Sequence, residues 1–379
     1  MTDPVGLTAM LVRCPSVTPE EGGALVLLRE LLEPAGFACT RIDRDGVPNL
    51  YARFGRGAPV FAFAGHTDVV PVGDPADWSA DPFGAEERDG WMLGRGSVDM
   101  KSGVAAFVSA SLRVADWLDP ERGSIALLIT GDEEGPSLDG TRAILDWMEE
   151  HGERADVCVV GEPSAAGRVG DRVRIGRRGS ANGVVTITGR QGHTAYPEQA
   201  ENPLPALARL ATRLAGETLD TGTAHFQPST LALTSIDVGN TATNVIPRRG
   251  RLAFNVRFND THTGESLRAW AERLLAEATA DSGLATTLDW TVSGEAFVTD
   301  PEGAVEPILA TVAAETGARP ELSTGGGTSD ARLIKTHCPV VEVGLVGQGM
   351  HAVDEAVPIA DIRTLADLYE AILRRYFDG

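Results

Sequence analysis

The sequence is poor in cysteine, and the few cysteines it has are far apart. Four occur among 379 residues, and none forms a CxxC pair. This spacing argues against a disulfide framework and against a zinc site built from paired cysteines. We expect them instead to be reduced, mostly buried and packed like small apolar residues. They are Cys14, Cys39, Cys158 and Cys338.

Long apolar runs and positive charge are also scarce. No apolar stretch reaches the length of a membrane span, and the first residues, MTDPVGLTAM, lack the basic segment of a signal peptide. A cytoplasmic location is therefore the default expectation. The 33 lysines and arginines are outnumbered by 54 aspartates and glutamates, a formal net charge of -21 at pH 7. This charge opposes binding to nucleic acid or an anionic membrane. A cleft with arginines or metal ions can still bind a small anionic substrate.

The length of the chain predicts more than one domain, because single cores stop growing at about 250–300 residues. Strands alternate with helices near both ends of the sequence, which predicts an α/β domain with a mostly parallel sheet flanked by helices. Between them lies a β-α-β-β-α-β order, typical of a ferredoxin-like unit. Its elements are expected at 183–189, 203–214, 229–238, 250–258, 263–281 and 286–292. We therefore predict one domain at 1–177 and 293–379, with an inserted domain at 178–292.

Several turns at the ends of predicted strands carry residues that bind metals. The runs 60–64, 125–130 and 156–160 are apolar and β-forming, and each is followed by a glycine and then by histidine or acids. Ligands of open α/β sheets bind at these strand ends. Each turn alone is explained equally well by a solvated acid or a core histidine. A turn that enters a helix adds Asp99, and a loop near the C-terminus adds His351. The candidate ligands are therefore His66, Asp99, Glu133, Glu134, Glu162 and His351.

Two imidazoles and four carboxylates suit a pair of zinc ions. Zinc accepts mixed nitrogen and oxygen ligands, and a catalytic site keeps one position open for water. One carboxylate would bridge two ions roughly 3.5–4 Å apart, and one acid would be left over as a base. The same ligands also accept Co²⁺ or Mn²⁺, so the residues alone do not select the metal.

Eight short motifs together resemble the zinc-dependent M20 amidohydrolase family. Any one of them is weak, but they occur in the family's order over nearly the full length of the chain. They are GHTDVVP, GRGSVDMKSG, TGDEEG, GEP, GRQGHTAYP, NVIP, GGTSD and MHAVDE. The resemblance implies hydrolysis of an amide by water that the metals activate, in a catalytic domain with an inserted dimerisation domain.

The resemblance also implies a role for each candidate ligand. Two zinc ions per subunit would share Asp99, with His66 and Glu162 completing one site and Glu134 and His351 the other. Glu133 matches the general base, which takes a proton from water and passes it to the leaving amine. Asp68 matches the acid that hydrogen-bonds the second ring nitrogen of His66. The peptide bond between Asp99 and Met100 is expected to be cis.

Residues of the inserted domain complete the implied site. His193 is expected to reach the active site of the partner subunit in a homodimer and to stabilise the tetrahedral oxyanion. Arg178 and Arg257 match positions that bind substrate carboxylates, for which arginine offers paired donors. Other segments that match substrate contacts are Asn244 and the turn Gly327, Thr328 and Ser329. A small substrate with several carboxylates and an α-amino group is implied.

The choice of acyl group is open within the family. GGTSD and MHAVDE favour a desuccinylase, and the alternatives are a deacetylase of the acetylornithine type, a dipeptidase or a carboxypeptidase. Relatives commonly carry an asparagine in the loop before the last histidine, whereas residues 346–349 read Val-Gly-Gln-Gly here. A relative that only binds metal or peptide is an alternative of another class, although no ligand and no base is missing from the sequence.

Overall fold

The computed structural model describes residues 3–327 and 329–378, which divide into two compact units. Unit 1 comprises Met1–Ile175, Thr299–Ser323 and Ser329–Gly379, and unit 2 comprises Gly176–Val298 and Thr324–Thr328. The sequence placed the inserted domain at 178–292 and did not assign 324–328 to it. A hydrogen bond connects this segment to unit 2, since the Thr324 hydroxyl donates to the carbonyl of His225 at 2.6 Å.

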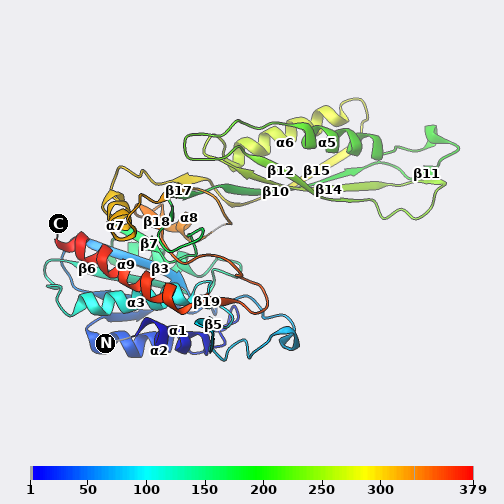
Figure 1. Cartoon of the computed structure of the whole chain (residues 1–379). Coiled ribbons are helices and arrows are strands. Elements are labelled where there is room, and N and C mark those ends of the chain that lie inside the picture. Colours follow the sequence, from blue (N-terminus) through cyan, green and yellow to red (C-terminus); the bar gives the residue numbers. More distant parts are fainter. Residues whose placement is uncertain (1–2, 328, 379) are drawn as a thin grey trace. The chain divides into compact units, whose positions relative to one another are not determined.

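An eight-stranded sheet forms the centre of unit 1 (Figure 1). Its order is β1 (Ala38–Arg41), β2 (Asn49–Phe54), β6 (Ser124–Thr130), β3 (Val60–His66), β7 (Val157–Val160), β18 (Val340–Glu342), β8 (Arg172–Arg174) and β17 (Glu321–Ser323). The four strands from β6 to β18 are parallel, and all of their residues are buried. The strands β1, β2 and β8 add antiparallel pairings at the sides. The predicted α/β sheet is confirmed, with a parallel centre.

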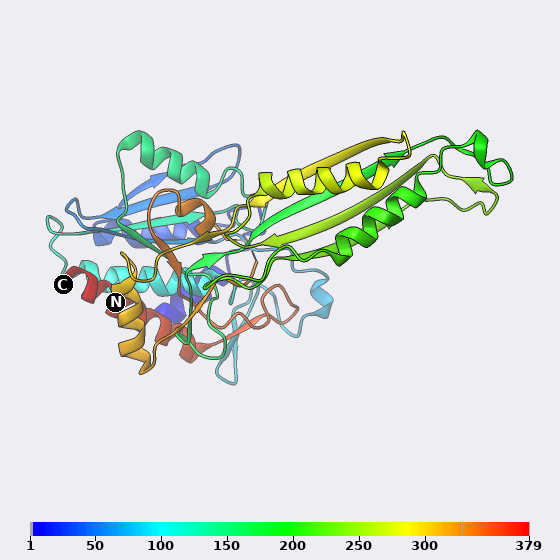
Figure 2. The same ribbon diagram turned by 90° about the horizontal axis from the view of Figure 1, so that it is seen from above.

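Helices cover both faces of this sheet (Figure 2). One face packs against α3 (Lys101–Ala115) and α9 (Ile359–Asp378), beside α1 (Pro4–Val12) and α7 (Glu306–Thr316), and the other against α4 (Thr141–His151) and α8 (Ala331–Ile334). The remaining elements of unit 1 are α2 (Ala24–Leu32), the 3-10 turns η1 (Glu33–Ala35) and η2 (Pro75–Asp77), and a small sheet of β4 (Glu86–Arg88), β5 (Trp91–Leu93) and β19 (Ala356–Pro358). No helix among the described residues is long and apolar enough to cross a bilayer.

Aromatic rings pack against the central strand that leads to the candidate site. Phe63 of β3 is fully buried, stacks on Phe107 with ring centroids 5.3 Å apart, and meets Tyr369 edge-on at 5.1 Å. The Tyr369 hydroxyl donates to the main-chain carbonyl of Val343. Close packing of this kind fixes the position of β3, and therefore of the turn that begins at His66.

The segment between α1 and α2 contains a sequence pattern typical of a helix start, but it forms no helix there. Thr18 and Pro19 favour the start of a helix, but α2 begins at Ala24. The main chain pairs instead with the residues that follow β3, because the Val69 amide donates to Ser16 and the Thr18 amide donates to Val69. The Ser16 hydroxyl also donates to the carbonyl of Thr67 at 2.6 Å. This pairing supports the turn beyond His66.

Unit 2 is a four-stranded antiparallel sheet with two helices on one face (Figure 1). Its chain order is β10 (Gly179–Thr188), α5 (Leu204–Gly216), β12 (Thr230–Asp237), β14 (Arg249–Phe258), α6 (Gly264–Thr279) and β15 (Ala285–Gly294). In space the strands lie in the order β12-β14-β10-β15. The β-α-β-β-α-β prediction is confirmed. Short pairs join β9 (Gly176–Arg177) to β16 (Phe297–Val298) and β11 (Gly192–His193) to β13 (Val245–Ile246), and η3 (Pro197–Gln199) follows β11.

Alternation of apolar and polar residues explains why α5 and α6 share one face. In β14, Leu252, Phe254, Val256 and Phe258 are buried, whereas the residues between them are partly exposed. Side chains of a strand point alternately to the two faces of its sheet. The apolar side chains therefore form one surface, and their core cluster includes residues of both helices.

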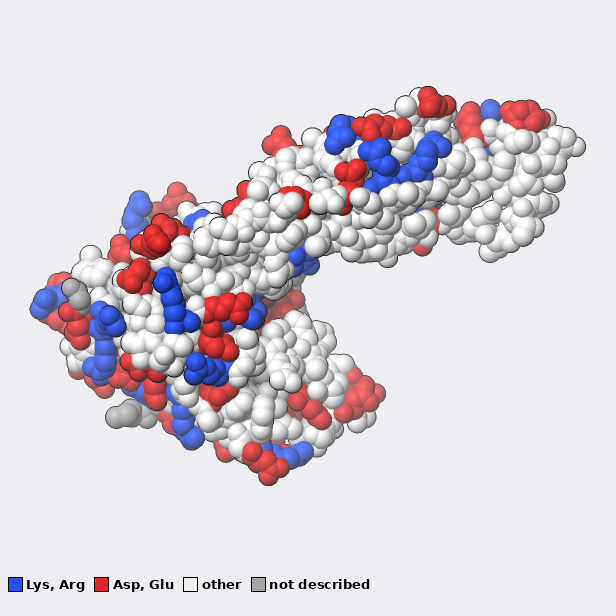
Figure 3. Space-filling model, turned by 45° about the horizontal axis from the view of Figure 1, so that its top comes forward, with Lys and Arg blue, Asp and Glu red and all other residues white. Residues whose placement is uncertain are grey.

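Charged side chains are spread widely over the surface. On the face that Figure 3 shows, acidic side chains are interspersed with arginines and lysines. Several form pairs one helical turn apart, such as Arg268 with Glu272 at 2.9 Å. Exposed pairs like this contribute little to stability, about 0.3–0.5 kcal/mol each.

Two leucines offer a matched test of the core of unit 1. Leu127 lies fully buried in β6, whereas Leu138 is 59% exposed. Leu127→Ala should lower the free energy of unfolding by about 2–5 kcal/mol, because it leaves a cavity in the sheet core. Leu138→Ala should change it by less than about 0.5 kcal/mol. Hydrogen exchange of peptides from β3 and β6 along a urea series measures both. Equal losses would contradict the core position of Leu127.

Candidate metal centre

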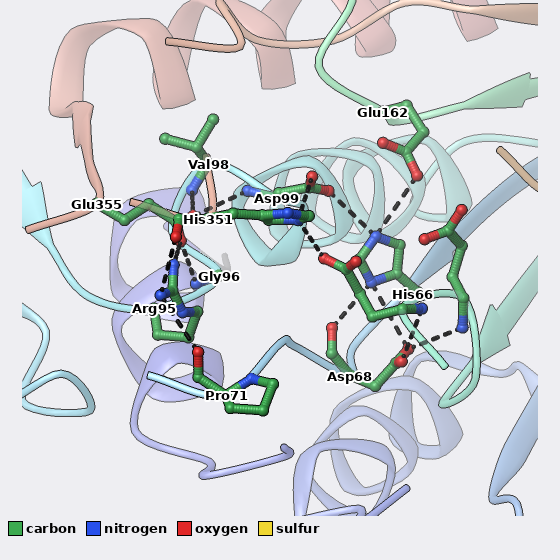
Figure 4. Close-up of polar contacts among 12 residues, drawn as sticks. His66, Asp68, Pro71, Arg95, Gly96, Val98, Asp99, Glu162, His351 and Glu355 are labelled. Carbon is green, nitrogen blue, oxygen red and sulfur yellow. Dashed lines mark hydrogen bonds and ion pairs between the residues drawn. The ribbon is translucent and has the colours of Figure 1, made fainter. Parts of the chain in front are cut away.

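The carboxyl ends of three parallel strands bring candidate ligands to one edge of the sheet. His66 is the last residue of β3, Glu133 and Glu134 follow β6, and Glu162 follows β7. Asp99 joins them from the turn that precedes α3. Figure 4 shows His66, Asp99 and Glu162, together with His351, turned toward one another. The structure therefore assembles all six candidate ligands within unit 1.

His66 is held with one ring nitrogen toward the acids. Its Nδ1–H donates to the main-chain carbonyl of Asp68 at 2.9 Å. This bond turns the other nitrogen, Nε2, toward the acids, 3.2 Å from Asp99 Oδ1 and 3.5 Å from Glu162 Oε1, where it donates a proton to Asp99 or, once that proton is lost, offers its lone pair to a metal ion. The side chain is 1% exposed. A neutral imidazole fixed in this tautomer presents the nitrogen that a metal ligand needs.

His351 approaches the same group of acids from the loop after β18. Its Nε2 lies 2.8 Å from Glu134 Oε1 and 3.5 Å from Asp99 Oδ2. Asp99 thus directs one carboxylate oxygen toward each histidine, which is the arrangement of a bridging carboxylate. The Asp99–Met100 peptide bond is cis, as the resemblance implied.

Asp68 supports the centre in a different way from the predicted one. We expected its carboxylate to hydrogen-bond the His66 ring, but the carboxylate oxygen lies 3.6 Å from Nδ1 and the main-chain carbonyl makes the bond. The carboxylate instead accepts the backbone N–H groups of Glu133 at 3.3 Å and Glu134 at 3.1 Å. One residue therefore orients both the histidine of β3 and the turn after β6.

Crowding of acids away from water raises several pKa values. Burial raises the pKa of Glu162 to about 7 and that of Asp68 to about 6, and it also raises the pKa of Glu133. Burial would raise the pKa of Asp99 as well, but hydrogen bonds from both histidines hold it below its usual range. The bond to Asp99 raises the pKa of His351 to about 9.

The negative charge of these carboxylates exceeds the positive charge that two protonated imidazoles can supply. Buried charges of one sign are stable only when opposite charge is near. The donor atoms also fit a cation: the groups His66, Glu133, Glu162 and His66, Asp99, Glu134 each offer ligand atoms within 4.8 Å of one another. A mixed set of nitrogen and oxygen donors is the type that zinc and related metals accept. The residues present therefore fit a metal centre.

Comparison with known proteins assigns the family. The sequence profile of peptidase family M20/M25/M40 matches residues 62–375. The chain belongs to this family. This chain is 58% identical over 377 residues to the succinyl-diaminopimelate desuccinylase of Cereibacter sphaeroides, a match that covers 99% of each chain. The protein is thus an M20 amidohydrolase, and the resemblance inferred from the motifs is confirmed.

Solved M20 structures share the fold at low sequence identity. The aminopeptidase PepT of Bacillus cereus superposes with a TM-score of 0.80 and 21% identity, covering 98% of this chain and 97% of that one. The YXEP protein of Bacillus subtilis, a dinuclear metal-binding M20 peptidase, gives a TM-score of 0.74 at 14% identity, with coverage of 98% and 97%. These values establish a common fold for the M20 chain.

Two of the predicted substrate residues of this M20 protein lie close together in unit 2. Arg257 of β14 pairs in register with Ser180, two residues after Arg178. The charge of Arg178 adds to burial in lowering the pKa of Arg257. The Nε atom of Arg178 is buried and has no hydrogen-bond partner among the described residues. Two adjacent guanidinium groups repel each other, so an anion between them would be stabilising.

His193 and Asn244 lie on neighbouring strands of unit 2. His193 of β11 pairs with Val245 of β13, and the Thr194 amide donates to the carbonyl of Asn244 at 3.0 Å. The Ala195 amide donates to His193 Nδ1 at 3.0 Å. An Nδ1 that accepts a hydrogen bond leaves the proton of a neutral ring on Nε2. The exposed His193 side chain therefore presents an N–H donor.

The predicted turn at 327–329 is only partly described. Thr328 lies outside the described residues, and Gly327 accepts a hydrogen bond from Arg177 at 2.8 Å through its carbonyl. Ser329 is fully buried, and its hydroxyl donates to Glu342. A substrate contact of these residues stays a prediction.

Two buried residues beside the candidate metal ligands have no signal in the sequence. Glu355, although part of MHAVDE, received no role, and Arg95 lies in the turn before Asp99. They form an ion pair at 2.7 Å with side chains 0% and 3% exposed. Nothing in the local pattern marks either residue as buried, because both lie in loops rich in polar residues.

Proposed function

We propose that the protein hydrolyses N-succinyl-LL-2,6-diaminopimelate to succinate and LL-2,6-diaminopimelate, a step of bacterial lysine and cell-wall precursor biosynthesis in the cytoplasm. The observation that carries this proposal is 58% identity to a succinyl-diaminopimelate desuccinylase over 99% of both chains. The assembled ligand set in unit 1 supports it, because amide hydrolysis by this family uses a metal centre. The pair Arg178 and Arg257 supports a substrate with carboxylates.

We assign the ligands of two Zn²⁺ ions as the motifs imply. Asp99 would bridge the two ions, His66 and Glu162 would hold one of them, and Glu134 and His351 would hold the other. The split between Asp99 Oδ1 and Oδ2, each toward one histidine, supports this assignment. When bound, zinc acts as a Lewis acid toward the amide carbonyl and lowers the pKa of water. Co²⁺ is the expected substitute, since it accepts the same donors.

Glu133 is the proposed general base. It takes a proton from the attacking water and delivers it to the amine nitrogen as the C–N bond breaks. A base with this double task needs a pKa near neutrality. Partial burial and the charge of Glu162 raise the pKa of Glu133, and the hydrogen bond from its amide to Asp68 holds it in the turn.

Residues of unit 2 are proposed to bind and stabilise the substrate. In a homodimer, the Nε2–H of His193 would donate to the oxyanion in the partner subunit's site, and the tautomer set by Ala195 supplies that proton. Arg178 and Arg257 would bind carboxylates. Further proposed contacts are Asn244 and the turn residues Gly327, Thr328 and Ser329, of which Ser329 belongs to unit 1.

The two adjacent glutamates should separate metal binding from proton transfer. Glu133→Gln should retain both metal ions and lose turnover, because it keeps the shape of the side chain and removes the base. Glu134→Gln should lose one ion, because it removes a ligand. Elemental analysis and a hydrolysis assay of both variants provide the comparison. Loss of zinc from Glu133→Gln would make Glu133 a ligand and overturn the assignment.

Substrate preference tests the proposed reaction directly. We expect kcat/KM for N-succinyl-LL-2,6-diaminopimelate to exceed that for acetylornithine and for dipeptides. A preference for acetylornithine would show a deacetylase, and a preference for peptides would show a dipeptidase or carboxypeptidase. Zinc binding with no hydrolysis of any amide would instead indicate a protein that only binds its ligand.

Mixing two inactive variants tests the role of His193 across a dimer. His193→Ala should bind zinc normally and lose roughly 10²–10³-fold in kcat, the usual effect of removing an oxyanion donor. In a mixed dimer with Glu133→Gln, one site carries both defects and the other carries neither. Random exchange should restore about a quarter of the natural activity, because half of the dimers are mixed and each has one intact site.

Subunit exchange must be shown independently, for example by mass spectrometry of differently tagged chains. Proven exchange without recovery of activity would place His193 in the site of its own chain. Mixing Glu133→Gln with Glu134→Gln is the matched control, since both residues belong to unit 1 of one chain. The proposed ligand assignment then gives every site of the mixed dimer one defect, so no recovery is expected.

A further inference from the structure

Glu355 is a buried carboxylate that the proposed chemistry does not use. Its side chain is 0% exposed and lies against the turn that ends at Asp99 (Figure 4). Oε1 accepts the amides of Val98 at 2.8 Å and Asp99 at 3.1 Å, and Oε2 accepts the amide of Gly96 at 3.1 Å. Three of the four backbone amides from Gly96 to Asp99 therefore donate to one carboxylate.

Arg95 extends this contact to two further segments. Its Nη1 donates to Glu355 at 2.7 Å and to the carbonyl of Ala352 at 3.2 Å. Its Nη2 reaches the carbonyls of His351 at 3.4 Å and Pro71 at 3.5 Å. The guanidinium also lies over the Trp78 ring, 5.1 Å from the centroid. Arg95 and Glu355 thus connect the Asp99 turn, the His351 loop and the chain beyond β3.

The two histidines depend on this connection to different degrees. His66 belongs to β3, and the carbonyl of Asp68 orients its ring. His351 lies in a loop with φ of 63°, a conformation unusual for a residue with a side chain, and its side chain is 46% exposed. The bonds of Arg95 to the carbonyls of His351 and Ala352 help to hold this loop beside Asp99, together with the bond from the Ser79 amide to Asp354.

We propose that Glu355 is a positioning residue that sets the distance between Asp99 and His351. A carboxylate is required, because it satisfies three backbone donors and neutralises a buried arginine at the same time. The inference rests on the proposed centre of two metal ions. It predicts that loss of Glu355 weakens the binding of the two ions unequally. The ion between Glu134 and His351 should depend on Glu355 more than the ion between His66 and Glu162.

The test is titration of the metal-free protein with Co²⁺, followed by visible absorption and calorimetry. Glu355→Gln keeps the size of the side chain but loses the charge and one acceptor oxygen. We expect its second Co²⁺ to bind roughly 10- to 100-fold more weakly, the usual effect of losing a group that orients metal ligands. The first Co²⁺ should bind with nearly natural affinity.

Two further variants make the result specific. His351→Ala removes the ligand itself, so its spectrum with one Co²⁺ defines the ion at His66, and Glu355→Gln with one Co²⁺ should match it. Glu153→Gln is the control for loss of a carboxylate from an ion pair in unit 1. Glu153 pairs with Arg53 and accepts the Tyr51 hydroxyl at 2.9 Å. The Glu153→Gln variant should bind both ions with the affinities of the natural protein.

Natural affinity for both ions in Glu355→Gln, or equal weakening of both, would overturn the proposal. If Glu355→Gln does not fold, Arg95→Lys gives the same test, because it keeps the charge beside Glu355 and removes the contacts to His351 and Ala352. Unchanged binding of both ions in Arg95→Lys would overturn the proposal as well. Failure of the natural protein to bind two Co²⁺ would contradict the proposed centre itself. The natural protein therefore distinguishes failure of the proposed centre from failure of the role given to Glu355.

Discussion

Mutual repulsion of carboxylates at one edge of a sheet is the constraint on which the rest of unit 1 depends. Parallel strands bring their carboxyl ends together, and here the turns at those ends carry acids. Such a group is stable only with cations in its centre and hydrogen-bond donors around it. Asp68 accepts hydrogen bonds from two backbone amides and Glu355 from three, so main-chain donors stabilise these two acids.

Strand and helix patterns predicted most of the fold from the sequence. The central strands of unit 1 are continuous apolar runs, and β14 of unit 2 alternates, so hydrophobic periodicity identifies both. Short strands such as β8 and β17 were missed, because three residues carry no periodic pattern. Thr18 was misread as a helix start, since its actual partner, Val69, is distant in sequence.

The candidate ligands were also predictable, but their supports were not. Histidines and acids after predicted strands are visible in the sequence, and eight ordered motifs imply their roles. The sequence does not indicate which atom of Asp68 bonds the His66 ring, because an aspartate offers both its carboxylate and its main-chain carbonyl as acceptors. The partners of Glu355 are mostly backbone amides, and every residue except proline has one. A contact to a backbone amide requires no particular residue type at the donor, so the sequence does not predict it.

The ion pair of Arg95 and Glu355 joins two segments that the ribosome makes at widely separated times. The amide of Asp99 and its acceptor Glu355 are 256 residues apart in the chain. At the usual speed of the ribosome, about 5–20 residues per second, the Asp99 turn waits roughly 10–50 s for that acceptor. All of unit 2 is synthesised in the interval. A nascent chain therefore carries its acids for most of its synthesis before His351 arrives, and the pair Glu134 and His351 is complete only near the end of translation.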